Sequence, residues 1–79
     1  MKAINKAYIQ TSFAEELLSY RRAHHLSQSK LARNLGITDR SYISLEHGGF
    51  CPSVITFLEF MQLMTEEECT AFLNTLLFA

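Results

Sequence analysis

Proline and glycine, the residues that most often interrupt helices, are scarce in this chain of 79 residues: it has one proline and three glycines. No run of alternating β-branched residues is present that would indicate strands. The hydrophobic share of 48% is enough for a folded core and argues against disorder. These features predict an all-α chain, and its length predicts a single domain, residues 1–79, with one small core.

Long apolar runs are also missing. Residues 1–18 contain no apolar stretch of the signal-peptide kind, and nowhere do about 18 consecutive apolar residues occur that could cross a membrane. The two cysteines, Cys51 and Cys69, fit reduced thiols, and a disulfide between them is the less favoured alternative. We therefore expect a soluble, cytoplasmic protein with no membrane partner.

No residue pattern for catalysis or for cofactor binding is found. The serines lack a Gly-x-Ser-x-Gly context, and no glycine-rich loop is present that could hold a phosphate. His24 and His25 are adjacent, so they point in different directions from a helix. His47 and the two cysteines lack the paired spacings of a zinc site. We expect no enzymatic activity, no metal, no cofactor and no small-molecule substrate.

The net charge of −1 hides an uneven distribution along the chain. Residues 1–20 are neutral, residues 21–49 carry five basic and two acidic side chains, and residues 50–79 carry four glutamates and no basic residue. The middle segment therefore has a net charge of +3 and the last segment −4. A positive field confined to one segment suits a phosphate backbone, although an ordinary solvated surface explains the charge equally well.

Capping residues and helical periodicity predict five helices. The first begins at Ser12, which has Glu15 at capping-box spacing. The second covers residues 27–35 and the third about residues 38–47, with a serine and a threonine as their N-caps. Gly36 follows the second helix at the position where a left-handed residue is needed. The fourth helix starts after a Pro-Ser pair, and a second capping-box pair starts the fifth.

The fifth helix, about residues 66–78, has so many apolar side chains near its end that they cannot all lie on one buried face. We expect Leu73 and Leu77 to pack inward. The side chains expected to remain exposed, as the interface of a homodimer, are Phe72, Leu76 and Phe78. The alternative is that the N-terminal arm, with Tyr8 and Ile9, covers these side chains within one chain.

The third helix presents two different faces at about 100° per residue. Ser41, Tyr42 and Leu45 fall on the side expected to face the core. The opposite side carries Asp39, Arg40, Ile43 and His47, with Ser44 at its edge. The second and third helices are joined by a turn of the length found in DNA-binding helix-turn-helix motifs. The polar outward face suits a DNA major groove.

The same region resembles a known family. The matching residues are Arg21, the run SQSKLARNLGI (27–37), the run SLEHG (44–48) and the pair Pro52-Ser53. Over about residues 13–64 the chain resembles the phage repressor/Cro-type helix-turn-helix family, often called the XRE family. The resemblance implies a compact five-helix domain of the lambda-repressor-like type. It also implies a non-enzymatic transcriptional regulator that binds double-stranded DNA sequence-specifically, with residues 39–47 as the recognition helix in the major groove.

The resemblance assigns roles to individual residues. The residues implied to contact DNA are Ser27, Gln28, Thr38, Asp39, Arg40, Ile43, Ser44 and His47. Gln28 would bond a phosphate, and Arg40 can pair bidentately with guanine O6 and N7. Ile43 could meet a thymine methyl group. Arg21 and Glu46 would form a structural ion pair that fixes the angle of the recognition helix.

Two features depart from the family pattern. The loop GGFCPS, residues 48–53, has no basic residue to grip a phosphate. Asp39 stands at a position from which family members contact base edges. There it either accepts a hydrogen bond from cytosine N4 or only stabilises the start of the helix through its negative charge. Both features favour an alternative function, a protein-interaction module of the antitoxin or anti-repressor type that uses the apolar C-terminal helix.

Overall fold

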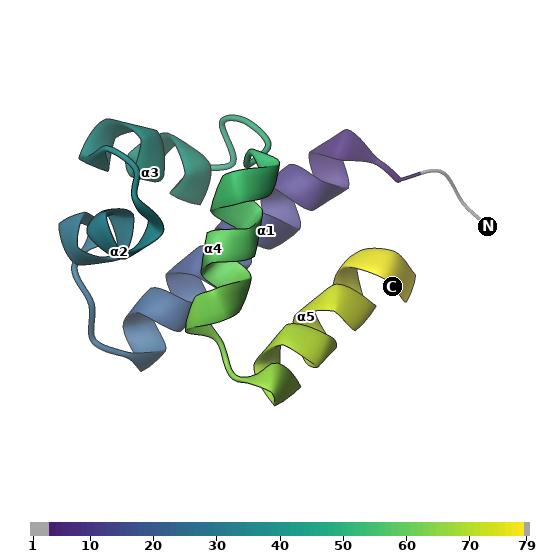
Figure 1. The fold of residues 1–79 in the computed structure, drawn as a ribbon. Coiled ribbons are helices and arrows are strands. Elements are labelled where there is room, and N and C mark those ends of the chain that lie inside the picture. The colour runs from purple at the N-terminus through teal and green to yellow at the C-terminus, as the bar shows by residue number, and fades with distance from the viewer. Residues whose placement is uncertain (1–3, 79) are drawn as a thin grey trace.

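Five α-helices make up the regular structure of residues 4–78, the part of the chain that the computed structural model describes (Figure 1). They are α1 (Lys6–Ala23), α2 (Gln28–Leu35), α3 (Asp39–Glu46), α4 (Val54–Leu63) and α5 (Glu66–Phe78). No strand occurs within these described residues. The predicted all-α class with five helices is confirmed.

Helix α1 begins well before Ser12, so the predicted start was wrong. The N-cap is Asn5, whose side-chain oxygen accepts from the backbone N–H of Tyr8 at 3.2 Å. Ile9 lies one helical turn before Phe13 and packs against the buried core. The buried stripe thus continues past Ser12, and packing of this stripe outweighs the local capping signal.

The other predicted N-terminal caps are present. The hydroxyls of Ser27, Thr38 and Ser53 accept from the backbone N–H three residues later, at 3.0, 3.1 and 3.1 Å. Thr65 and Glu68 form the reciprocal bonds of a capping box, at 2.9 and 3.1 Å. Such a cap contributes about 0.5–2 kcal/mol to stability, so local chemistry defines these four helix starts.

Left-handed residues end α1 and α2. Gly36 has φ +71°, which lets its N–H donate to the carbonyl of Arg33 and the N–H of Ile37 donate to that of Ala32. His25 adopts the same conformation after α1, with φ +54°, although it is not a glycine. Its side chain makes this conformation less favourable than it is for glycine.

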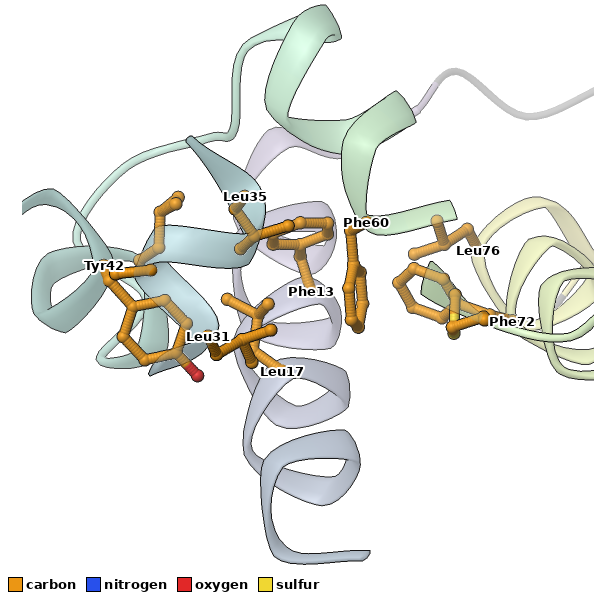
Figure 2. Packing of buried hydrophobic residues seen from close by; sticks show 11 residues of the cluster. Phe13, Leu17, Leu31, Leu35, Tyr42, Phe60, Phe72 and Leu76 are labelled. Atoms are coloured by element: carbon orange, nitrogen blue, oxygen red, sulfur yellow. The ribbon is translucent and has the colours of Figure 1, made fainter. Parts of the chain in front are cut away.

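The core contains buried side chains from all five helices, shown in Figure 2. They include Phe13, Leu17, Leu31, Leu35, Tyr42, Phe60, Phe72 and Leu76. The rings of Phe13, Phe60 and Phe72 form a triangle with centroid distances of 5.4, 6.2 and 6.3 Å. These distances are typical of favourable aromatic pairs, and the three rings join α1, α4 and α5.

The predicted faces of α5 are reversed in the structure. Phe72 and Leu76 are only 4% and 9% exposed, so neither belongs to an exposed interface. Leu73 and Leu77, which were expected to pack inward, are 37% and 56% exposed, whereas Phe78 is 79% exposed, as expected. The expectation was wrong because the Phe72 ring enters the aromatic triangle, and this contact sets the rotation of the helix.

The N-terminal part of α1 also contacts α5. The Tyr8 hydroxyl donates to the backbone carbonyl of Thr75 at 3.0 Å. Ile9 packs against the same core that holds Phe72 and Leu76. The first turns of α1 therefore cover part of the C-terminal helix within one chain.

Candidate nucleic-acid interface

Helices α2 and α3 form the helix-turn-helix, with a short turn between them (Figure 1). The inner face of α3 is fixed by Tyr42 and Leu45, which are 0% and 2% exposed. This face packs on α1 and α2. The prediction that Tyr42 and Leu45 face the core is confirmed, whereas Ser41, expected on the same side, is only half-buried.

The outer face of α3 is open to solvent. Asp39, Arg40 and His47 are exposed, Ile43 is 40% exposed and Ser44 is half-buried. In Figure 1, α5 lies at the far end of the molecule from α2 and α3, so the C-terminal helix does not cover this face. The structure thus brings the predicted α3 side chains together on one accessible surface.

The Glu46 carboxylate, at the end of α3, is the centre of a polar network. It accepts two bonds from the Arg21 guanidinium of α1, from Nε at 2.9 Å and from Nη2 at 3.0 Å. It also accepts from Gln28 Nε2 of α2 at 3.1 Å and from the hydroxyl of Tyr42. The predicted ion pair between Arg21 and Glu46 is therefore present, and the network joins α1, α2 and α3.

The charges in this network are stabilised by their partners. Burial alone would raise the pKa of Glu46, but the hydrogen bonds from Arg21, Tyr42 and Gln28, together with the Arg21 charge, lower the pKa below its usual value. Burial and the nearby carboxylate raise the pKa of Tyr42, so its hydroxyl keeps its proton. The hydrogen bond to Glu46 raises the pKa of Arg21. The network is thus ionic at neutral pH.

Gln28 has a partner that the sequence did not indicate. Its side chain is half-buried and donates to Glu46, which lies 18 positions away. Because the Gln28 side chain donates to Glu46, the donors left for a phosphate at the start of α2 are backbone N–H groups. The bond from Tyr42 to Glu46 was also missed, although their i, i+4 spacing on one helix was a usable signal.

A second contact joins the first turns of α2 and α3. The Ser29 hydroxyl donates to Asp39 Oδ2 at 2.6 Å, and both residues are exposed. No local sequence pattern predicts this pair, because its members lie 10 positions apart on different helices. Ser27 and Thr38 were predicted to contact DNA. Their hydroxyls accept hydrogen bonds from backbone N–H groups as helix caps. Both of these residues are also exposed.

The remaining candidate groups lie outside this surface. The Cys69 thiol donates to the carbonyl of Met61 at 3.0 Å, and both Cys51 and Cys69 are free thiols. Within residues 4–78, no group of three or more His, Cys, Asp or Glu side chains is placed to hold a metal ion. None of the helices in this described range is both long enough and apolar enough to span a membrane.

Comparison with known proteins agrees with this geometry. Residues 17–64, more than half of the chain, match the family model described as helix-turn-helix. No curated protein and no solved structure matches the chain. The matched segment covers α2, α3 and α4 and includes every residue of the Glu46 network. The protein therefore belongs to the XRE-type helix-turn-helix family of the lambda repressor and Cro, and it is a DNA-binding regulator.

Proposed function

We propose that the protein recognises a specific sequence of double-stranded DNA and regulates transcription, with residues 39–47 as the recognition helix in the major groove. The observation that carries this proposal is the exposed face of α3, where Arg40 and Ile43 meet solvent. The opposite face is buried, and Glu46 ties the end of the helix to α1 and α2. A helix held in this way presents its side chains to a groove without rearrangement.

The distribution of charge supports the same surface. The exposed basic residues Arg22, Lys30, Arg33 and Arg40 lie on α1, α2 and α3. The acidic first turn of α5, residues 66–68, belongs to the helix at the far end of the molecule (Figure 1). A DNA duplex on the α3 side would thus meet the positive part of the chain, where phosphate contacts supply much of the affinity.

Selection of bound duplexes from a random library tests this function. We expect the wild-type protein to enrich one consensus sequence, and Arg40→Ala to lose preference at one position and about 1–3 kcal/mol of binding free energy. The matched control is Arg22→Ala, which removes the same charge from α1. We expect it to weaken binding to all duplexes slightly and to leave the consensus unchanged. A wild-type protein that enriches no sequence would contradict the proposal.

We further propose that the protein is a homodimer whose interface is the exposed face of α4. Val54, Ile55 and Leu58 form one stripe on this helix and are 73%, 69% and 53% exposed. A twofold interface pairs a surface with itself, and these three apolar side chains can pair with the same side chains of a second copy. The stripe begins soon after α3 ends, whereas α5 lies at the far end of the molecule from α3 (Figure 1), and the longest dimension of the molecule is 37 Å. Pairing through α4 therefore suits recognition helices about 34 Å apart better than pairing through α5.

Two matched variants test this interface by sedimentation velocity and DNA binding. We expect Leu58→Glu to give a monomer that binds the selected sequence more weakly, because a buried charge opposes pairing. We expect Leu77→Glu, on α5, to remain a dimer. A monomeric Leu77→Glu together with a dimeric Leu58→Glu would show that the interface lies on α5.

A second candidate function is a protein-interaction module of the antitoxin or anti-repressor type. The observation that favours it is the exposed apolar end of α5, with Leu73, Leu77 and Phe78. This function predicts weak DNA binding with no sequence preference. Leu77→Glu is a suitable test of partner binding, because removal of the helix after Thr70 would also remove the buried residues Phe72 and Leu76.

A further inference from the structure

The hydrogen bond between Ser29 and Asp39 is not explained by helix capping. Ser27 already caps α2 and Thr38 already caps α3, each through its own hydroxyl. Ser29 lies two positions after Ser27 and Asp39 lies one position after Thr38, and both are exposed. The contact lies where the first turns of the two helices meet, beside the exposed Arg40.

The bond has a clear effect on the Asp39 carboxylate. Oδ2 accepts from the Ser29 hydroxyl at 2.6 Å, so the side chain is held in one orientation. The other oxygen, Oδ1, has no hydrogen in the ionised form and can only accept a bond. Asp39 therefore presents a fixed acceptor on the surface that carries Arg40, which can only donate.

A fixed acceptor selects among the base edges of the major groove. Cytosine presents the N4 amino group there as a donor, whereas guanine and thymine present acceptors. Adenine presents the N6 donor next to the acceptor N7, which repels a carboxylate. Cytosine is thus the base that complements Asp39, as guanine complements Arg40.

We propose that Ser29 and Asp39 form one base-reading unit, in which Asp39 accepts from cytosine N4 and Ser29 is the positioning residue that holds the carboxylate. The unit rests on the proposed function, because it requires α3 to lie in the major groove. In this unit Asp39 contributes to the choice of base, while repulsion between its carboxylate and nearby phosphates lowers the affinity for DNA. The unit also gives Ser29, outside the recognition helix, a role in the choice of base.

Selection from a random duplex library with single variants tests this unit. We expect the wild-type consensus to contain a strongly preferred cytosine, in addition to the position that Arg40→Ala relaxes. Asp39→Asn should lose this preference, with a shift toward adenine, because an asparagine amide can pair with adenine N6 and N7. Ser29→Ala should keep cytosine as the preferred base but discriminate on the order of 10-fold less at that position alone.

Two controls separate positioning from general effects. Ser19→Ala makes the same change at an exposed serine of α1 and should alter no base preference. Ser29→Thr retains the hydroxyl donor and should preserve the cytosine preference. Thermal unfolding by circular dichroism should show that each variant is folded.

The outcomes distinguish this inference from the proposed function. Suppose that Asp39→Asn leaves every base preference unchanged and strengthens binding to all duplexes. Asp39 would then serve only at the helix start, and the inference would be overturned while sequence-specific binding stands. Unchanged discrimination in Ser29→Ala would remove the positioning role. A wild-type protein that enriches no sequence would overturn both proposals.

Discussion

The two halves of the molecule are stabilised by different interactions. The end of α3 is held by a polar network around Glu46, which accepts hydrogen bonds from α1, α2 and α3 itself. The contact of α4 and α5 with α1 depends instead on packing of the Phe13, Phe60 and Phe72 rings. The polar network sets the direction of one helix through specific bonds, whereas the aromatic packing joins α1, α4 and α5 through buried apolar side chains. We therefore expect loss of orientation and loss of stability to be separable by mutation.

The largest expected effect is on the aromatic half. Phe72→Ala should destabilise the protein by about 3–5 kcal/mol, because it leaves a cavity between Phe13 and Phe60. Leu77→Ala on the same helix is the control, and its 56% exposed side chain should cost about 0.5 kcal/mol or less. Urea unfolding followed by circular dichroism measures both changes. If Leu77→Ala lowered the free energy of unfolding more than Phe72→Ala, Leu77 rather than Phe72 would lie on the buried face of α5, as the sequence predicted.

The next largest effect is expected in the polar half. Glu46→Gln should destabilise the protein by about 3 kcal/mol, because Arg21 loses its carboxylate partner and its side chain is only 21% exposed. Unlike Phe72→Ala, this variant should bind DNA more weakly even under conditions where it is fully folded. Glu67→Gln removes an equal charge from an exposed position of α5 and serves as the control. Equal DNA affinity of folded Glu46→Gln and wild type would contradict the orienting role of the network.

The same network should contribute to the pH dependence of stability. The folded pKa of Glu46 is lowered, so its contribution to stability is complete above the pKa of the unfolded chain and is lost as the pH falls through the folded value. Burial raises the pKa of Glu16, which acts in the opposite direction. The difference between wild type and Glu46→Gln isolates the Glu46 contribution. Unfolding free energies measured from pH 7 to pH 2 should converge for the two proteins, and a constant difference would contradict this account.

The smallest expected effect lies at the end of α1. His25 has φ +54°, so His25→Gly should relieve unfavourable backbone geometry and stabilise the protein by at most about 1 kcal/mol. The adjacent His24 has φ −100°, and His24→Gly should give no such gain. Thermal unfolding compares the two variants. A larger gain from His24→Gly would contradict the assignment of strain to His25.

The same division explains how much the sequence alone could predict. The N-caps Ser27 and Thr38 and the left-handed Gly36 are local signals, and they placed α2 and α3 correctly. The start of α1 and the buried face of α5 depend on contacts between distant residues, such as Phe72 with Phe13, and were predicted wrongly.

Individual contacts in the site show the same limit. The ion pair between Arg21 and Glu46 was predicted through the family resemblance, because these residues are 25 positions apart and no local pattern joins them. The bond from Gln28 to Glu46 and the bond from Ser29 to Asp39 were not predicted at all. Hydrogen bonds between helices depend on how the helices cross, and helical periodicity does not contain this information.

The most direct test of the central claim is protection of guanine N7 from methylation in a duplex that the protein has selected. Guanine N7 lies in the major groove, where Arg40 would donate to it. We predict that the wild-type protein protects a guanine in each half-site and that Arg40→Ala loses this protection while the Arg22→Ala control retains it. Tight binding of the selected duplex with every guanine N7 still reactive would contradict major-groove recognition by α3.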